Sequence, residues 1–440
     1  MRPLRFAGPI ACEVGHPVAS IAGVSTGLPA PHRPLPIRLL NGTGRAWRRL
    51  GIESRGLSEE RVLERARKAT GLDDFGDPHF REPLRMLLAS LEREAKLSAL
   101  GRIFARRQLQ ELLVGRLQLI EHAKRYPEVA DEKIEAPLFV LGLPRTGTTL
   151  LHGLLAQDPA HRAPISWELD DPGVPARPET FERDPRIART ARRFAQLNQL
   201  APGFQTVHPI GATLPQECIV ITAFDFWGVR FEMAFDIPSY QRWMVDADPA
   251  PAYRFHRRML QHLQSGGVRG RWVLKTPGHL GTLDALLGEY PDARIVQLHR
   301  DPVRIVPSVA SLEYNLRTIA TDDQDTAALG DNMLWLWSLY LERALETRDA
   351  HPEKSGQFAD FHYRELVADP LGCVGRLYDR FGMELSEEAE RRMRSYLAEN
   401  PQHKHGRHRY SLEMFGLDEE QVADAFASYC KRFGVEREAP

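Results

Sequence analysis

Residues 137–155 read PLFVLGLPRTGTTLLHGLL, and this stretch decides the fold. Its first part, PLFVLGL, is a compact apolar run that reaches a glycine turn, which predicts a buried parallel strand. The remainder, from Gly142 to Leu155, predicts a turn that opens into a helix. Because the N–H groups of such a turn and of the helix N-terminus point at one spot, the order strand, turn, helix predicts an anion site.

The glycines of this turn have the spacing G-x-x-x-x-G, which matches only part of a Walker A loop. A Walker A loop continues with Lys and then Ser or Thr, whereas this chain has Thr148 and Thr149. A cation is present instead at Arg145, three residues earlier, and the two threonines supply hydroxyl donors. The alternative is an ordinary capped helix after a strand, since Thr and Gly are common at helix starts and in turns.

Three further apolar runs predict strands, and helical stretches separate them; they are 272–275, 294–299 and 357–361. This alternation predicts an α/β fold in which a parallel sheet is flanked by helices. Apolar residues at three- and four-residue spacing before it predict a helical region over 32–135, which follows a flexible tail over 1–31. Residues 136–440 then form the α/β domain, with an insertion at 157–270 that we expect to build a substrate pocket.

Basic and acidic residues nearly cancel, 58 against 59, for a formal charge of −1. This balance argues against a protein that binds nucleic acid over its whole surface, so any anion site must be local. The four cysteines are far apart and indicate neither a disulfide framework nor a metal site. No apolar run approaches the length of about 18 residues that a membrane span needs, so we expect a cytoplasmic protein without bound metal.

The motif P-R-T-G-T-T after an apolar strand resembles the 5′-phosphosulfate loop of the sulfotransferases that use 3′-phosphoadenosine-5′-phosphosulfate (PAPS). The usual form in that family is P-K-S-G-T-T, with lysine at the position of Arg145 and serine at that of Thr146. The resemblance implies a P-loop-like turn in which five residues bind the donor: Arg145, Thr146, Gly147, Thr148 and Thr149. Arginine keeps the positive charge and adds a bidentate fork.

A second anion site is predicted where the third strand ends in His299-Arg300-Asp301-Pro302, because Asp followed by Pro is a strong helix start. In the family that the chain resembles, an Arg and a Ser eight residues apart bind the 3′-phosphate, which implies this role for Arg300 and Ser308. The resemblance also implies that Tyr363 contacts the adenine. Lys404, Gly406 and Arg407 resemble, without matching the motif, a loop that closes over the 3′-phosphate.

The residues that act on the sulfuryl group are expected at the carboxyl end of the predicted strand 272–275, because ligands of open α/β sheets bind at the carboxyl ends of strands. Lys275, one of only eight lysines, ends this strand, and the resemblance implies that it holds the sulfuryl oxygens. Two residues stay open as the general base. His279 is two positions later than the family histidine, and Glu168 has about the place of a glutamate that another branch of the family uses.

The implied reaction is in-line transfer of a sulfuryl group from PAPS to a hydroxyl or amine of a small-molecule acceptor, leaving 3′,5′-ADP. Aromatic residues in the insertion favour an apolar alcohol or a lipid, or else they belong to the core; they are Phe224, Phe226, Trp227, Phe231, Phe235, Tyr240 and Trp243. The alternatives are a P-loop nucleotide kinase or hydrolase and a non-catalytic nucleotide-binding protein. A homodimer stays open.

Overall fold

The computed structural model describes residues 33–50, 56–200, 211–400 and 410–438. Within these residues, five strands form one parallel sheet in the order β2-β3-β1-β4-β5. The strands are β1 (Leu138–Gly142), β2 (His161–Arg162), β3 (Arg271–Lys275), β4 (Arg294–His299) and β5 (Phe358–His362). The central strand β1 pairs along its whole length with β4, from Leu138 opposite Arg294 to Gly142 opposite Leu298. The expected α/β fold with a parallel sheet is confirmed.

The predicted strands agree closely with the observed ones. Runs 272–275 and 294–299 are found as β3 and β4, and the last strand begins one residue later than predicted. The sequence analysis missed β2, because two residues at the sheet edge, His161 and Arg162, carry no apolar run that could mark a strand.

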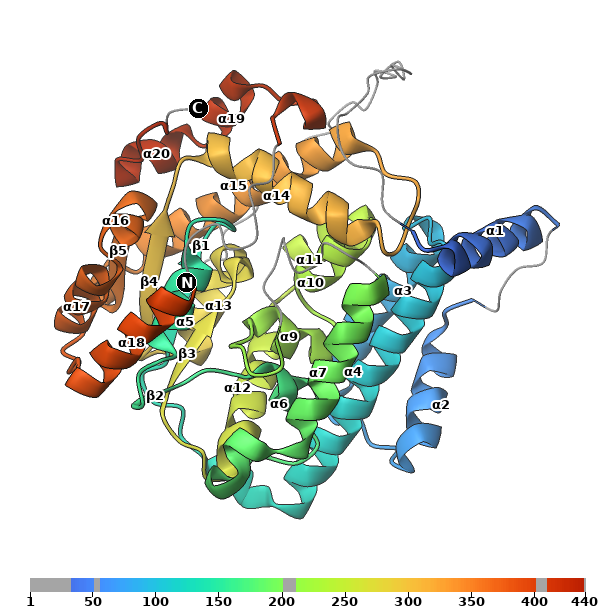
Figure 1. The fold of residues 1–440 in the computed structure, drawn as a ribbon, viewed down its shortest axis with the longest axis horizontal. Coiled ribbons are helices and arrows are strands. Elements are labelled where there is room, and N and C mark those ends of the chain that lie inside the picture. Colours follow the sequence, from blue (N-terminus) through green and yellow to red (C-terminus); the bar gives the residue numbers. More distant parts are fainter. Residues whose placement is uncertain (1–32, 51–55, 201–210, 401–409, 439–440) are drawn as a thin grey trace, which may run out of the picture.

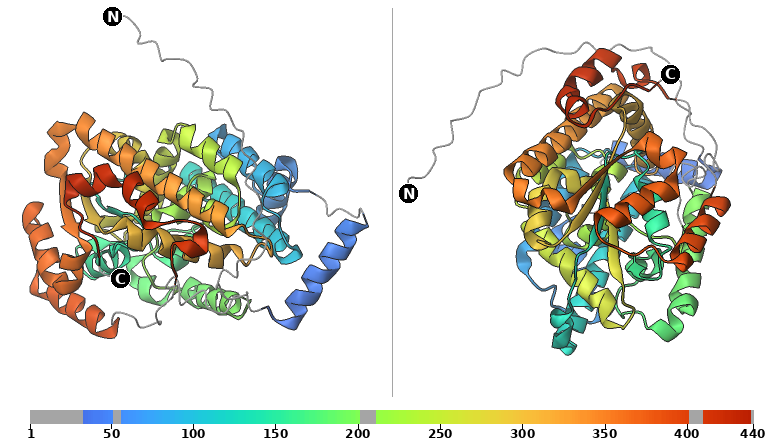
Figure 2. Two further views of the ribbon diagram at one scale, coloured as in Figure 1. Left: turned by 90° about the horizontal axis from the view of Figure 1, so that it is seen from above. Right: turned by 90° about the vertical axis from the view of Figure 1, so that its left-hand side faces the viewer.

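Helices cover both faces of the sheet, since successive side chains of each strand point to opposite faces (Figure 2). Leu138 and Val140 pack in one apolar cluster with α5 (Thr148–Leu155), α16 (Tyr363–Ala368), α17 (Pro370–Arg380) and α18 (Glu387–Glu399). Phe139 and Leu141 pack in the other. Helices of this second face are α12 (Ala250–Ser265), α13 (Leu283–Glu289), α14 (Pro302–Arg317), α15 (Thr326–Ala350), α19 (Glu419–Ala425) and α20 (Ala427–Phe433).

The N-terminal helical region lies against the second face, at the right of Figure 1. It consists of α1 (Leu35–Arg49), α2 (Glu59–Thr70), α3 (Arg81–Arg93) and the long α4 (Ala99–Arg125). A buried ion pair joins α4 to the insertion: Arg116 Nη1 lies 2.8 Å from Asp225 Oδ1, and the same nitrogen donates to the carbonyl of Phe224. These helices therefore share their core with the segment that follows β1.

The insertion between β1 and β3 is largely helical. After β2 it contains α6 (Ser166–Asp170), α7 (Pro185–Leu200), α9 (Cys218–Thr222), the 3-10 turn η4 (Ala223–Asp225), α10 (Arg230–Ala234) and α11 (Pro238–Asp246), and it ends with α12. Its aromatic residues are mostly core: Phe226, Phe231 and Tyr240 are fully buried, and Phe235 nearly so. Within the described residues, no helix combines the length and apolar character needed to cross a bilayer.

The order of the strands determines where a ligand would bind. From β1 the chain proceeds to β2 and β3 on one side, whereas from β4 it proceeds to β5 on the other. Neighbouring strands whose connections leave in opposite directions form a topological switch point, and ligands of open α/β sheets bind there, at the carboxyl ends of the strands. The switch point of this sheet lies between β1 and β4.

Candidate functional site

The turn between β1 and α5 is built around residues with left-handed backbone. Gly142, Arg145 and Gly147 have φ values of 145°, 71° and 92°. A Cβ on Gly142 would lie 2.7 Å from the carbonyl oxygen of Leu298 on β4, so only glycine fits beside that strand. The buried hydroxyl of Thr146 donates to the carbonyl of Leu143 at 2.7 Å and closes the turn from within.

The helix N-terminus that follows is open for an anion. Gly147 is the N-cap of α5, and no side chain caps that end. The first N–H groups of a helix have no partner within the helix and attract negative charge. Arg145 and Thr149 are exposed on either side of Gly147, while Thr148 is buried. The turn therefore has the donors and the charge that the sequence analysis expected of a 5′-phosphosulfate loop.

Lys275, at the end of β3, reaches the same helix end. Its ammonium group lies 3.2 Å from the hydroxyl of Thr149 and forms an ion pair with the carboxylate of Glu217. The lysine side chain is almost completely buried. Behind it, His152 of α5 donates through Nε2 to the carbonyl of Val273, and burial, together with the charge of Lys275, lowers the pKa of His152 to about 4. The imidazole is therefore neutral and does not oppose the lysine at neutral pH.

Arg300, which follows β4, meets the turn from the other side of the switch point. Its Nη1 donates to the carbonyl of Arg145 at 2.8 Å, and its guanidinium carbon lies 3.9 Å from the centre of the Tyr363 ring. Tyr363 also borders the turn, since a Cβ on Gly147 would lie 3.2 Å from its ring. The structure thus brings Arg145, Gly147, Arg300 and Tyr363 together at the expected end of the sheet.

A carboxylate already occupies the outer edge of Arg300. Nε and Nη2 donate to the two oxygens of Glu438 at 2.8 and 3.0 Å, in a bidentate pair. Burial is the largest single influence on the pKa of Arg300 and would lower it, but the hydrogen bond to Glu438, together with the charges of Tyr363, Glu438 and Tyr410, raises this pKa overall. The N–H of Glu438 donates to Asp301, the residue whose other oxygen caps α14 through Val303. A group with the shape and charge of a phosphate edge is therefore compatible with this position.

The remaining predicted residues lie in different places. Ser308 is buried two turns into α14. Lys404, Gly406 and Arg407 lie outside the described residues.

The two candidate bases are committed to interior partners. His279 is fully buried, a 2.6 Å hydrogen bond joins its Nδ1 to the hydroxyl of Tyr253, and burial lowers its pKa well below the usual value. Glu168 is equally buried in a 2.7 Å ion pair with Arg162, and burial raises its pKa. Neither has a contact with Lys275 or with the turn among those the structure describes.

Sequence reasoning missed Glu217 and Glu438. Glu217 is a single acidic residue at the start of the apolar run Cys218–Val229, and this position was its one signal. It forms the N-terminal boundary of α9, and its carboxylate is the partner of Lys275. Glu438 carried no signal, because nothing in the local sequence pattern indicates that it reaches Arg300.

Comparison with known proteins identifies the family. The sequence profile of the sulfotransferase family matches residues 137–387, which is more than half of the chain. The chain belongs to the sulfotransferase family. The match begins at β1 and extends past β5, so it includes the turn, Lys275, Arg300 and Tyr363.

Solved sulfotransferases share the fold. Sulfotransferase STF9 from Mycobacterium avium is 31% identical, with a TM-score of 0.80 over 88% of this chain and 100% of its own. Sulfotransferase STF1 from Mycobacterium tuberculosis H37Rv is 37% identical, with a TM-score of 0.77 over 84% of this chain and 99% of its own. Both structural matches cover more of the chain than residues 137–387, which the family profile matches.

A curated relative carries a more specific name. The omega-hydroxy-beta-dihydromenaquinone-9 sulfotransferase Stf3 of Mycobacterium bovis is 25% identical over 338 residues, which are 74% of this chain and 82% of Stf3. The nodulation protein NoeE of Sinorhizobium fredii is 33% identical over a shorter stretch, 39% of this chain and 30% of NoeE.

Proposed function

We propose that this sulfotransferase moves a sulfuryl group from PAPS to the hydroxyl of an apolar, lipid-like alcohol and releases 3′,5′-ADP. The observation that carries the proposal is the contact of Arg300 with the backbone of Arg145 across the switch point. It gives two cationic sites on adjoining strands, as a nucleotide with phosphate on both its 3′ and 5′ oxygens requires.

The donor binds with its two ends at these sites. The open N-terminus of α5, Arg145 and the threonines face the 5′-phosphosulfate, and Arg300 faces the 3′-phosphate. Tyr363 borders both sites and stacks against Arg300, which fits the adenine contact that the resemblance implies. Lys404, Gly406 and Arg407 remain predicted contacts to the 3′-phosphate.

The transfer step places negative charge beside Lys275. The acceptor oxygen attacks sulfur while the bond between sulfur and the 5′-phosphate oxygen breaks, and the acceptor proton passes to a base. Fixed cations and helix N–H groups stabilise such charge strongly because they need no reorganisation. Lys275 supplies this charge at the side of α5 on which Thr149 lies.

Glu217 is the best placed base. A carboxylate in contact with Lys275 lies within reach of an acceptor that approaches the sulfuryl group, and geometry precedes pKa in the choice of a base. His279 and Glu168 stay the alternatives, although each is held by an interior partner. Movement of Lys275 towards the sulfuryl oxygens frees Glu217 for the acceptor proton.

The surroundings of Glu217 favour an apolar acceptor. Ile219 and Val220 of α9 follow it after Cys218 and are only partly buried. Apolar side chains left accessible next to a polar reaction centre are typical of ligand sites. The relative Stf3 is named for a hydroxylated menaquinone derivative, which is an acceptor of this class.

The alternative of a P-loop kinase or hydrolase has less support. Such an enzyme needs a lysine directly after the second glycine of the turn, and that position holds Thr148, whose side chain is buried. Lys275 comes instead from a neighbouring strand.

Two assays test the proposal. With PAPS labelled in the sulfuryl group, we expect label in long-chain alcohols or hydroxylated quinones, and 3′,5′-ADP should raise the melting temperature more than Mg-ATP does. Stabilisation by Mg-ATP alone, with hydrolysis, would instead identify a nucleotide hydrolase. Binding of 3′,5′-ADP without transfer to any acceptor would support the non-catalytic alternative.

A further inference from the structure

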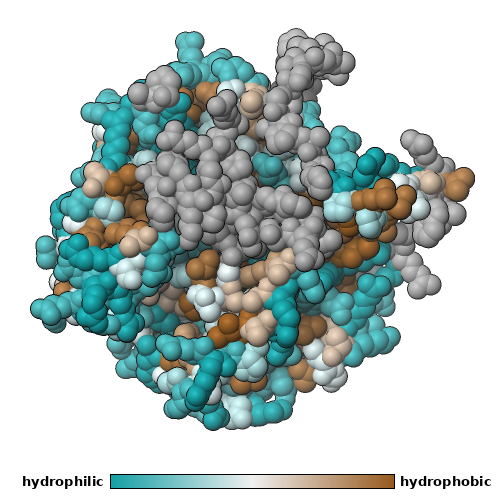
Figure 3. Space-filling model, in the orientation of Figure 1, coloured by the Kyte–Doolittle hydropathy of each residue, from teal (hydrophilic) through white to brown (hydrophobic). Residues whose placement is uncertain are grey.

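The outward face of α1 carries an apolar stripe that the rest of the described structure does not cover. Leu35, Leu39, Ala46 and Leu50 are spaced by four, seven and four residues and so lie on one helix face. The three leucines are 64%, 61% and 73% exposed. Figure 3 shows hydrophobic residues at the right-hand edge of the molecule, where Figure 1 places α1.

The stripe cannot turn inward, because the opposite face of α1 is anchored. Ile37 and Asn41 are buried, and Asn41 accepts a hydrogen bond from the N–H of Leu100 at 3.1 Å. A Cβ on Gly44 would lie 2.8 Å from that of Ala99. The helix is therefore fixed against the first turn of α4 with its leucines facing solvent.

The surroundings of the stripe are positively charged. α1 contains no Asp or Glu, and Arg38 and Arg45 are exposed on it. A cavity of about 220 Å³ between α2 and α4, the helix on which α1 packs, is lined by four basic residues and one acid, Glu64; the bases are Arg61, Arg65, Lys68 and Arg106.

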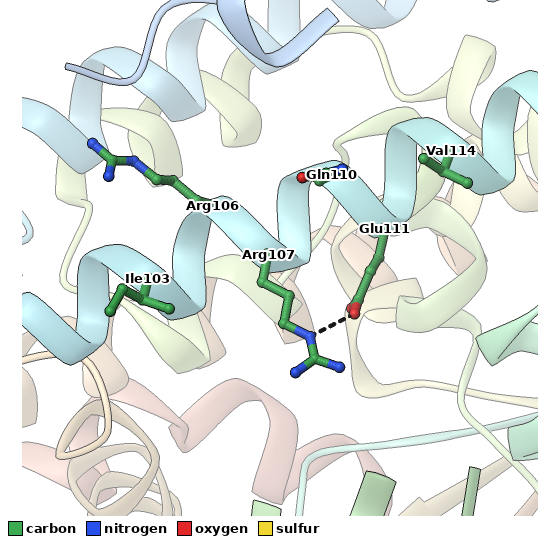
Figure 4. Close-up of a pocket in the computed structure, with 6 residues that line it drawn as sticks. All are labelled: Ile103, Arg106, Arg107, Gln110, Glu111 and Val114. Atoms are coloured by element: carbon green, nitrogen blue, oxygen red, sulfur yellow. Dashed lines mark hydrogen bonds and ion pairs between the residues drawn. The ribbon is translucent and has the colours of Figure 1, made fainter. Parts of the chain in front are cut away.

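A second cavity continues this surface along α4. It has a volume of about 460 Å³ and is lined by Ile103, Arg106, Arg107, Gln110, Glu111 and Val114, of which Arg107 pairs with Glu111 at 2.8 Å (Figure 4). Ile103 is half exposed and lies one turn after Ala99, where α1 packs. The first cavity shares Arg106 with it. The linings of the two cavities thus hold apolar and basic side chains with two acids among them, Glu64 and Glu111.

We infer that this face, formed by the α1 stripe and the basic residues of α2 and α4, docks on the surface of a bilayer that contains anionic phospholipid. Amphipathic helices with leucines on one face and arginines on the other lie in the plane of such an interface. Each basic residue near an anionic surface adds about 1 kcal/mol of attraction. The inference goes beyond the proposed function, since docking does not depend on sulfuryl transfer.

Charge favours a bilayer over a second copy of the chain. In a two-fold dimer the same surface meets itself. Exposed arginines of α1 would then lie near their copies with no acid on that helix to pair with them, and Asp322, an acid beside the helix, already pairs with Arg45. Anionic headgroups provide the opposite charge, and the acyl chains below them accept the leucines.

Vesicle flotation with the full chain tests the inference. We expect binding to vesicles of phosphatidylcholine with phosphatidylglycerol, much weaker binding to phosphatidylcholine alone, and release at high salt. Leu35→Glu with Leu39→Glu should weaken binding about tenfold or more, given the energy of burying leucine side chains. The matched control is Val174→Glu, because Val174 is 68% exposed on the insertion, away from α1, and its substitution should leave binding unchanged.

A second variant tests the charge separately. Arg61→Ser with Arg65→Ser leaves α1 intact and should reduce the dependence on phosphatidylglycerol. Equal flotation of the parent and both double variants would overturn the inference. So would a parent that binds no vesicles but is a dimer that the α1 substitutions convert to a monomer. Each result stands whether or not label is transferred from PAPS.

Discussion

The ion pair of Lys275 with Glu217 joins the end of β3 to the insertion at the proposed site of sulfuryl transfer. The two residues are 58 positions apart, and the insertion carries Glu217 to the end of β3. Motif spacing locates residues that follow strands, as it did for Arg145, Lys275 and Arg300. It does not locate a carboxylate whose position depends on how a long helical segment folds back. This is the physical reason why Glu217 was missed.

Substitution of Glu217 tests its role as base. Glu217→Gln keeps the size of the side chain but removes the proton acceptor, so kcat should fall about 100-fold or more. The affinity for 3′,5′-ADP should stay within a few-fold, because the described partner of the Glu217 carboxylate is Lys275, which is proposed to act on the sulfuryl group that 3′,5′-ADP lacks.

Glu168→Gln is the matched control for this experiment. Because Glu168 is buried against Arg162, the variant should lower the melting temperature rather than kcat. The opposite pattern, with full activity in Glu217→Gln and a loss of kcat at unchanged stability in Glu168→Gln, would move the assignment to Glu168.

Substitution of Glu438 tests the role of its ion pair with Arg300. Its carboxylate holds the edge of Arg300 that the proposed 3′-phosphate contact would use, so under this proposal the two groups compete. Glu438→Gln removes the negative charge and should lower the Kd for 3′,5′-ADP about three- to tenfold, measured by calorimetric titration. Glu436→Gln is the control, since Glu436 pairs with Arg364 and not with Arg300. Equal effects of both substitutions would contradict the competition.

Most of the strands could be predicted from the sequence. The strands that end at the site are apolar runs followed by turn residues, and this pattern survives in the fold because each strand is buried on both faces. The two-residue strand β2 was not predictable, because it exists through pairing with β3 and not through its own sequence. The sequence does not distinguish aromatic residues that line a pocket from those that fill the core. Most aromatic residues of the insertion fill the core.

The turn between β1 and α5 can be tested through Gly147. Alanine there would have a φ of 92°, and its Cβ would lie 3.0 Å from Leu366 and 3.2 Å from Tyr363. We expect Gly147→Ala to lower the free energy of unfolding by about 1–3 kcal/mol and to weaken 3′,5′-ADP binding.

Gly375→Ala in α17 is the matched control for the turn. The added methyl group would meet nothing within 4 Å, and alanine favours a helix over glycine by about 1 kcal/mol. Urea unfolding of the two variants should therefore shift in opposite directions. A stable Gly147→Ala with unchanged nucleotide affinity would contradict the described turn.

The whole molecule has a net charge near zero, and it buries several histidines whose protonation affects its stability. Burial lowers the pKa of His152 and of His262 to about 4 and that of His256 to about 3. The unfolded chain therefore binds protons that the native state does not, as pH falls from about 6.5 to these values. The stability that these histidines contribute is complete above about pH 6.5 and is lost as the pH falls towards 4, whereas buried carboxylates with a raised pKa, such as Glu313 at about 7, contribute in the opposite direction.

Urea unfolding across this range checks the sign. One such histidine changes the free energy of unfolding by up to about 1.4 kcal/mol per pH unit, so His152→Gln should make the slope measurably shallower. His351→Gln should not, because His351 is only partly buried and the hydrogen bonds to Asp284 and Glu353 raise its pKa. An unchanged slope in His152→Gln would contradict the neutral, buried state of that side chain.

The central claim of the proposed function is that one nucleotide binds at both sites of the switch point. The decisive measurement is calorimetric titration of 3′,5′-ADP and of 5′-AMP into the parent chain and into Arg300→Ala. Since charge-assisted hydrogen bonds contribute about 1.5–3 kcal/mol each, the parent should bind 3′,5′-ADP roughly 100-fold more tightly than 5′-AMP. Arg300→Ala should bind the two nucleotides almost equally while it remains folded. A variant that still prefers 3′,5′-ADP as strongly as the parent does would contradict the two-site account.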